Sequence, residues 1–201
     1  FQPRLSISRQ RITGVEALLR WDSKEFGMVS PAQFIPLAEE SGMILEIGAW
    51  ALREACLTLR NWHDQGLEEL SMAVNVSATQ LQRGDLQKVV ARTLQETGVP
   101  AGRLELELTE SVVMASPEQN ADTLRACRRL GISLAIDDFG TGYPSLAYLK
   151  RLPLTTLKID REFISDLTHD TDDEAITSTI ITMGQSLALK VVGEGVETWD
   201  Q

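Results

Sequence analysis

Short strand-like segments alternate with longer amphipathic helical segments along almost the whole chain, and this alternation restricts the fold more than any other feature. A helix between two strands supplies the crossover connection that a parallel sheet requires. The segments that favour strands are Phe1–Ile7, Arg11–Arg20, Ser71–Val76, Arg103–Thr109, Ile132–Asp137, Thr155–Ile159 and Lys190–Gly193. Because the first two are too close together for a helix, we expect an antiparallel hairpin followed by a parallel sheet.

The helical segments between these strands have recognisable ends. Serine three residues before glutamine favours a helix N-terminus, and proline directly after a serine favours the first helical position. Helix starts are therefore expected after Ser30, Ser77 and Ser116. Glycine readily adopts the left-handed conformation that ends a helix. Helix ends are expected at Gly66, Gly98 and Gly131.

This pattern favours an α/β fold, a TIM-like (β/α) barrel with an antiparallel first strand. The 201 residues suffice for one sizeable domain, and we predict a single domain over residues 1–201. Barrels of this class typically have about 250 residues and eight strands. Since few residues follow the last strand candidate, we expect the last helix and strand of the barrel to be missing from this sequence.

Composition and charge argue against several functions. Hydrophobic residues make up 43% of the chain and charged residues 24%, as in ordinary globular proteins. The net charge of −10, without a basic tract, argues against binding to long nucleic acid. No apolar run approaches the roughly 18 residues of a membrane-spanning helix, so we predict no membrane contact from this segment. Cys56 and Cys127 lie outside any CxxC motif, which favours reduced core thiols and a cytoplasmic location.

Polar residues occur inside or just beyond the strand segments, where an ordinary core strand would have valine or isoleucine. They are Glu16, Asn75, Glu107, Asp137, Asp138, Lys158, Asp160, Glu194 and Glu197. The carboxyl ends of the strands in a parallel barrel meet at one face, where such enzymes place their active sites. The sequence therefore predicts that these separate segments contribute to one site.

The residue types in this set favour divalent metal ions. Several carboxylates with only Arg20 and Lys158 nearby would repel one another unless cations neutralise them. The chain has only two histidines, which disfavours a histidine-rich zinc site or a Ser-His-Asp triad. Carboxylate and carboxamide oxygens suit Mg²⁺ or Mn²⁺. One carboxylate of the Asp137–Asp138 pair would be placed to bridge two ions about 3.5–4 Å apart, a geometry used for phosphoryl displacement.

Each polar residue also has an ordinary structural explanation. Glu105 and Glu107 share one face, as in any half-exposed strand, and adjacent aspartates are common at helix starts. The acidic stretch Asp170–Glu174 is interpreted as a solvated helix entry. The tripeptide Asp138-Phe139-Gly140 resembles a protein-kinase motif, but the chain has no glycine-rich loop upstream and no His-Arg-Asp element, so that match is discarded.

In their order along the chain, these residues resemble the EAL domains, phosphodiesterases of the bacterial second messenger cyclic di-GMP. Glu16-Ala17-Leu18 is the motif that names the family. The resemblance continues through Phe34–Glu39, Asn75–Ser77, Glu107–Ser111, Asp137–Gly142, Leu157–Asp160 and Gly193–Thr198, and covers nearly the whole chain. It implies hydrolysis of one phosphodiester of cyclic di-GMP to linear pGpG, with two Mg²⁺ or Mn²⁺ ions per site.

The resemblance also assigns roles to individual residues. It implies that the metal ligands are Glu16, Asn75, Glu107, Asp137 and Asp138. Glu194 would be a further ligand or a base, and Lys158 would contact the nucleophilic water. The residues that would support the site are Asp160, Glu197 and Glu110, of which Glu110 would steady the loop after Asp138. The residues that would contact the substrate are Gln2 and Arg20.

The same resemblance implies the partners of this protein. It implies cyclic di-GMP as ligand, a homodimer, and sensory or cyclase domains elsewhere in the full-length protein. Pro144 stands where the family usually has serine, which leaves the behaviour of the loop open.

A receptor that binds cyclic di-GMP without cutting it would have lost metal ligands, and no such loss is seen. A barrel enzyme using one Mg²⁺, with Lys158 as the base for enolisation, would leave the aspartate pair and its glycine-containing loop unexplained.

Overall fold

The computed structural model describes residues 1–140 and 146–201. The chain divides into two compact units. The first comprises Phe1–Leu106 with Ala126–Ile132, and the second comprises Glu107–Arg125 with Ser133–Gln201. Strand β6 (Leu104–Thr109) and helix α6 (Pro117–Arg129) contribute residues to both units.

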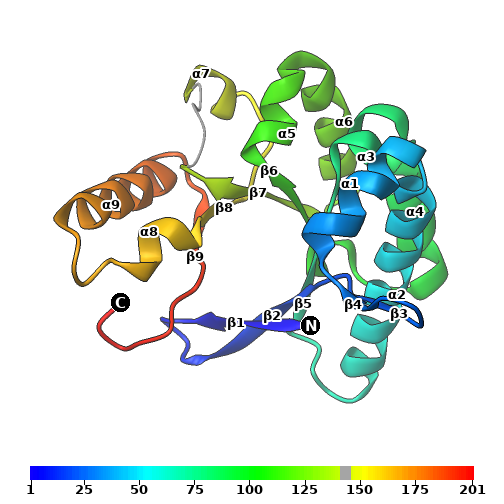
Figure 1. Ribbon diagram of the computed structural model, residues 1–201, viewed down its shortest axis with the longest axis horizontal. Coiled ribbons are helices and arrows are strands. Elements are labelled where there is room, and N and C mark those ends of the chain that lie inside the picture. The colour runs from blue at the N-terminus through cyan, green and yellow to red at the C-terminus, as the bar shows by residue number, and fades with distance from the viewer. Residues whose placement is uncertain (141–145) are drawn as a thin grey trace. The chain divides into compact units, whose positions relative to one another are not determined.

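The first unit begins with the expected hairpin. Strands β1 (Gln2–Ser6) and β2 (Arg11–Ala17) are antiparallel, and Gln2 lies opposite Glu16. Strand β2 then pairs in parallel with β5 (Ser71–Asn75), and β6 follows β5 in the order of the sheet. Figure 1 shows the hairpin in blue, at the start of the chain. Both predicted strand directions are confirmed.

Helices of the first unit connect these strands. They are α1 (Pro31–Ser41), α2 (Ile44–Asp64), α3 (Ala78–Arg83), α4 (Leu86–Thr97) and the short 3-10 helix η1 (Ala101–Arg103). Ser77 forms a reciprocal capping box with Gln80 at the start of α3, which confirms that helix start. Ser30 precedes α1 as predicted, but its side chain makes no capping hydrogen bond. Gly98 ends α4 with a φ of 67°, as expected.

A small second sheet in this unit was not predicted from the sequence. Strands β3 (Trp21–Ser23) and β4 (Gly27–Val29) form an antiparallel hairpin. Strands of three residues are too short to show the alternation on which strand prediction depends. The ring of Trp21 packs edge-on against Phe34, with centroids 5.8 Å apart, which anchors the hairpin to α1.

The second unit contains the rest of the parallel sheet. The order runs from the end of β6 through β7 (Ser133–Phe139) and β8 (Thr156–Ile159) to β9 (Lys190–Gly193). β7 pairs in parallel with β8, and β8 with β9, as predicted. The helices wholly inside this unit are α5 (Glu110–Ala115), α7 (Leu146–Leu149), α8 (Arg161–Ser165) and α9 (Thr171–Ser186).

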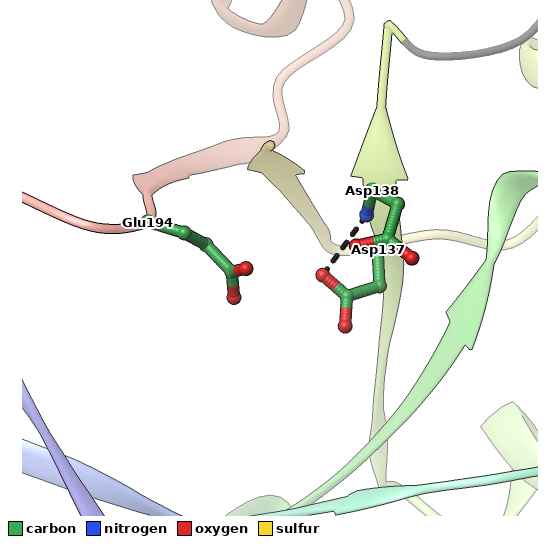
Figure 2. A group of neighbouring side chains, drawn as sticks. All are labelled: Asp137, Asp138 and Glu194. Carbon is green, nitrogen blue, oxygen red and sulfur yellow. Dashed lines mark hydrogen bonds between the residues drawn. The ribbon is translucent and has the colours of Figure 1, made fainter. Parts of the chain in front are cut away.

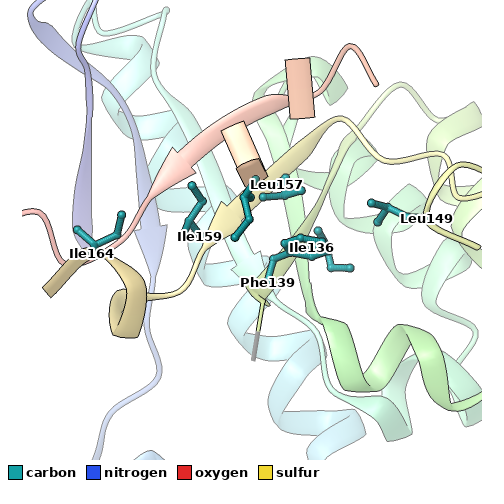
Figure 3. Packing of buried hydrophobic residues seen from close by; sticks show 7 residues of the cluster. Ile136, Phe139, Leu149, Leu157, Ile159 and Ile164 are labelled. Atoms are coloured by element: carbon teal, nitrogen blue, oxygen red, sulfur yellow. The ribbon is translucent and has the colours of Figure 1, made fainter. Parts of the chain in front are cut away.

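One hydrophobic cluster holds this sheet against its helices. Its buried members are Ile136, Phe139, Leu149, Leu157, Ile159, Ile164 and Ile180, most of which are labelled in Figure 3. Ile136, Leu157 and Ile159 come from the strands, whereas Ile164 and Ile180 come from α8 and α9. Burial of this apolar area stabilises the strands whose ends carry the polar residues.

The cysteines and the acidic stretch at the start of α9 have the positions that the sequence predicts. Cys56 and Cys127 are buried free thiols, and burial raises their pKa values to about 12 and about 11. Asp170 caps the exposed start of α9 by accepting a hydrogen bond from the backbone of Asp172, so the acidic stretch is a helix entry as predicted. Across residues 1–140 and 146–201, we find no helix with the length and apolar character needed to cross a membrane.

Candidate metal centre

The end of strand β7 places two consecutive carboxylates together. Neighbouring residues of a regular strand point to opposite faces, but the pairing of β7 with β8 shifts register between Ile136 and Phe139. Asp138 lies at this irregularity with a φ of 52°, a left-handed conformation that aspartate tolerates better than most residues. Oxygen atoms of Asp137, Asp138 and Glu194 consequently lie within 4.8 Å of one another. Figure 2 shows Glu194 pointing toward the aspartate pair.

A buried lysine connects the carboxylates of this unit. Lys158 on β8 is 1% exposed, and its Nζ lies 3.0 Å from Glu107 Oε2, 3.0 Å from Asp137 Oδ2 and 2.6 Å from Glu194 Oε1. Glu107 on β6 is itself 0% exposed. The ammonium group therefore offsets negative charge that would otherwise be buried at high cost.

Asp138 is held in a strongly acidic neighbourhood. Partial burial raises its pKa from the ordinary value of 3.8 to about 6, and the charge of Asp137 acts in the same direction. A hydrogen bond with Asp160 and the charge of Glu194 raise the pKa further. Repulsion between neighbouring carboxylates is what a divalent cation relieves, so this carboxyl group is suited to a metal site.

The raised pKa predicts a pH dependence of stability in the metal-free protein. Between pH 3.8 and about pH 6, the folded protein retains a proton on Asp138 that the unfolded chain releases. The stability that this group contributes is therefore present at low pH and is lost as the pH rises through about 6. Asp138→Asn stays neutral, so we expect the variant to melt above the wild type at about pH 8, with little difference below about pH 4.

Thermal melts in the presence of a chelator measure this difference. Asp172→Asn is the matched control, because Asp172 is an exposed aspartate on the first turn of α9. Equal melting temperatures of wild type and Asp138→Asn at the higher pH would contradict the prediction.

The donor set fits a hard divalent cation. The second unit offers carboxylate oxygens from Glu107, Asp137, Asp138 and Glu194, and Lys158 contacts three of these four residues. Oxygen-only sites of this kind suit Mg²⁺ or Mn²⁺ and are poor for zinc or copper. Such an ion would relieve the repulsion between Asp138 and the neighbouring carboxylates of Asp137 and Glu194.

Glu110 supports the segment that follows the aspartate pair. It is the first residue of α5, is 4% exposed, and accepts a hydrogen bond from the backbone N–H of Gly140 at 3.3 Å. Gly140 has a φ of 107°, and a Cβ there would lie 2.7 Å from the ring of Phe163. Glycine is therefore required at this position. Residues Thr141–Tyr143 and Pro144, which belong to the predicted loop after Asp138, lie outside the described residues.

Asn120 is a supporting residue that sequence reasoning missed. It lies on α6, is 1% exposed, and its Nδ2 donates hydrogen bonds to the carbonyls of Val112 at 3.0 Å and Val113 at 3.1 Å. These contacts satisfy carbonyl groups in the last turns of α5, the helix that begins at Glu110. The sequence feature that could have identified Asn120 is its position next to Ala121, on the buried face of an amphipathic helix.

The first unit holds the remaining predicted ligands and substrate contacts. Asn75 Nδ2 donates a hydrogen bond to Glu16 Oε1 at 2.7 Å, which brings these two predicted ligands together. Gln2 lies beside Glu16 in the register of the hairpin, so a predicted substrate contact neighbours a predicted ligand. Arg20 is exposed, and its Nη1 donates to the carbonyl of Leu19 at 2.8 Å.

The other two predicted supporting residues, Asp160 and Glu197, differ in position. Asp160 caps α8 by accepting a hydrogen bond from the backbone of Glu162 at 2.7 Å, and it also contacts Asp138. Glu197 is exposed and forms an ion pair with Arg161 at 3.0 Å. The structure therefore brings Asp160 to the carboxylate cluster, and the described ion pair of Glu197 lies at the surface.

Comparison with known proteins gives close relatives. MucR of Pseudomonas aeruginosa, a bifunctional diguanylate cyclase/cyclic di-GMP phosphodiesterase, is 46% identical over 198 residues, which are 98% of this chain and 29% of MucR. The cyclic di-GMP phosphodiesterase NbdA of the same organism is 47% identical over 201 residues, which are 100% of this chain and 26% of NbdA. The chain thus spans less than a third of each of these relatives.

A solved structure supports the fold in the same way. The MucR phosphodiesterase in complex with c-di-GMP matches this chain with a TM-score of 0.93 at 46% identity, over 98% of this chain and 80% of that one. Fold and site define the class as α/β proteins of the TIM-like barrel type with acidic residues at the strand ends. The family described as EAL domain matches residues 1–201, and the chain belongs to this family.

Proposed function

We propose that this chain hydrolyses one phosphodiester of cyclic di-GMP to linear pGpG with the help of two Mg²⁺ or Mn²⁺ ions. The observation that carries the proposal is the cluster of Asp137, Asp138 and Glu194, in which one carboxylate oxygen from each residue lies within 4.8 Å of the others. The substrate is supported by relatives named as cyclic di-GMP phosphodiesterases and by a c-di-GMP complex of MucR.

The proposed metal ligands are those that the resemblance to EAL domains implies. They are Glu16, Asn75, Glu107, Asp137, Asp138 and Glu194. When bound, the cations would activate the attacking water and stabilise the charge that develops on the phosphate. The irregularity in β7 brings one oxygen each of Asp137 and Asp138 near Glu194. Such preorganisation avoids rearrangement during the reaction.

The other polar residues would act on water, protons or substrate. Lys158 would donate a hydrogen bond to the nucleophilic water, and Glu194, which is 29% exposed, would be accessible to take up its proton. Gln2 and Arg20 would contact the nucleotide and its phosphate. Asp160 would hold Asp138 in place. A supporting role for Glu197, a homodimer, and further domains in the full-length protein remain predictions.

A turnover assay tests the proposal. Full-length protein carrying this chain is incubated with cyclic di-GMP and Mg²⁺ or Mn²⁺, and the products are separated by chromatography. We expect linear pGpG. Tight binding of cyclic di-GMP by calorimetry without any product would instead identify a receptor and would overturn the proposed activity.

Glu110→Ala is expected to impair this activity without unfolding the protein. The substitution removes the acceptor for Gly140 N–H, and with it the support of the segment after the aspartate pair. We expect turnover to fall by roughly 10- to 100-fold, with weaker metal or substrate binding. Steady-state kinetics measures the loss of turnover and of binding, and circular dichroism checks that the protein remains folded. Glu118→Ala is the control, because Glu118 is an exposed glutamate on α6. Near-normal kinetics in Glu110→Ala would contradict the prediction and leave Glu110 with a structural role only.

A further inference from the structure

The position of Lys158 has a consequence for the affinity of the metal site. Its Nζ lies 2.6–3.0 Å from one oxygen each of Glu107, Asp137 and Glu194. These three carboxylates belong to β6, β7 and the segment just after β9. The ammonium group thus contacts the same kind of oxygen atoms that a divalent cation would need.

Burial makes these contacts strong. Lys158 is 1% exposed and Glu107 is 0% exposed, so water cannot replace the ion pairs effectively. Opposite charges in a site of low effective dielectric attract each other far more strongly than at the surface. A cation that binds these carboxylates meets the positive charge of the lysine beside it, and it must displace the lysine contacts wherever it takes the same oxygen atoms.

We propose that Lys158 acts as an internal counter-ion that competes with divalent metal ions for Glu107, Asp137 and Glu194, and so lowers the metal affinity of the site. The inference rests on the proposed function in that Mg²⁺ or Mn²⁺ binds here. In the metal-free protein the lysine stabilises the buried negative charge of these carboxylates. The same contacts raise the concentration of metal ion needed to load the site.

Substitution of Lys158 by methionine tests this competition. Lys158→Met removes the charge and keeps most of the apolar side chain, so the side chain no longer competes for these carboxylates. Calorimetric titration with Mn²⁺ at about pH 8 is expected to give a dissociation constant lower by about tenfold or more, since a charge within about 4 Å of a cation interacts with it strongly even at an effective dielectric near 20. Lys150→Met is the control, because Lys150 is an exposed lysine. The Mn²⁺ affinity of this variant should equal that of the wild type.

Equal or weaker Mn²⁺ binding by Lys158→Met would overturn the proposal, because the lysine would then position the carboxylates rather than compete for them. A measurement on the wild type covers the case in which the variant does not fold. With ¹⁵N-labelled lysine, the buried Lys158 ammonium signal is expected to shift when diamagnetic Mg²⁺ saturates the site. If calorimetry shows that Mg²⁺ saturates the site and the Lys158 ammonium signal does not change, the proposal is also overturned.

Binding and hydrolysis are measured separately, so the two proposals fail in different ways. Hydrolysis by the wild type, together with unchanged Mn²⁺ affinity in Lys158→Met, would reject the competition and keep the phosphodiesterase. Tighter Mn²⁺ binding by the variant, together with no hydrolysis by the wild type, would reject the enzyme and keep the competition.

Discussion

Replacement of Asp138 by asparagine is expected to lower the turnover of cyclic di-GMP by several orders of magnitude while weakening nucleotide binding much less. Asparagine keeps the shape of the side chain and tolerates the left-handed backbone of this position, where φ is 52°. The variant loses one negative charge of the cluster formed with Asp137 and Glu194. If two cations drive the chemistry, loss of one of them removes both water activation and charge stabilisation on the phosphate.

Hydrolysis is measured by chromatography and binding by calorimetry, for wild type and variant, in Mg²⁺. Asp172→Asn serves again as the control for a change of one surface charge. Guanine and ribose contacts do not involve Asp138 in the proposed mechanism, so only part of the attraction for the phosphate should be lost. Turnover close to that of the wild type in Asp138→Asn would exclude this residue from the metal site.

Exchange of the metal ion is expected to have a comparably large effect. Mg²⁺ and Mn²⁺ should support hydrolysis, whereas Ca²⁺ should bind and fail to support it. Calcium forms longer bonds of about 2.3–2.6 Å with looser coordination, while magnesium imposes octahedral geometry at about 2.0–2.1 Å. The longer bonds would displace the attacking water and the phosphate from the line required for displacement.

The rates with each ion are compared after exhaustive chelation and readdition of a single metal. Calorimetry with Ca²⁺ confirms that the ion is bound under the conditions of the assay. Comparable rates with Ca²⁺, or full activity in the chelated protein, would contradict the two-metal proposal.

Local sequence patterns determined the elements and the chemistry of this protein. The alternation of strands and helices predicted the antiparallel hairpin of β1 and β2 and the parallel strands that follow. Ser77 and Gln80 marked a helix start that the structure confirms. These features depend on neighbouring residues and on backbone preferences, so they can be recognised within a short window. The polar residues at the strand ends indicated oxygen ligands for the same reason.

Tertiary structure decided how those polar residues are arranged. Strand periodicity places Asp137 and Asp138 on opposite faces, and only the shifted pairing of β7 with β8 brings both toward Glu194. Lys158 and Glu107 are 51 residues apart, so no local pattern reports their ion pair. The contacts of Asn120 with the end of α5 likewise depend on how two helices pack. Residue types are a property of the sequence, whereas distances between strand ends arise only when the strands pair and pack.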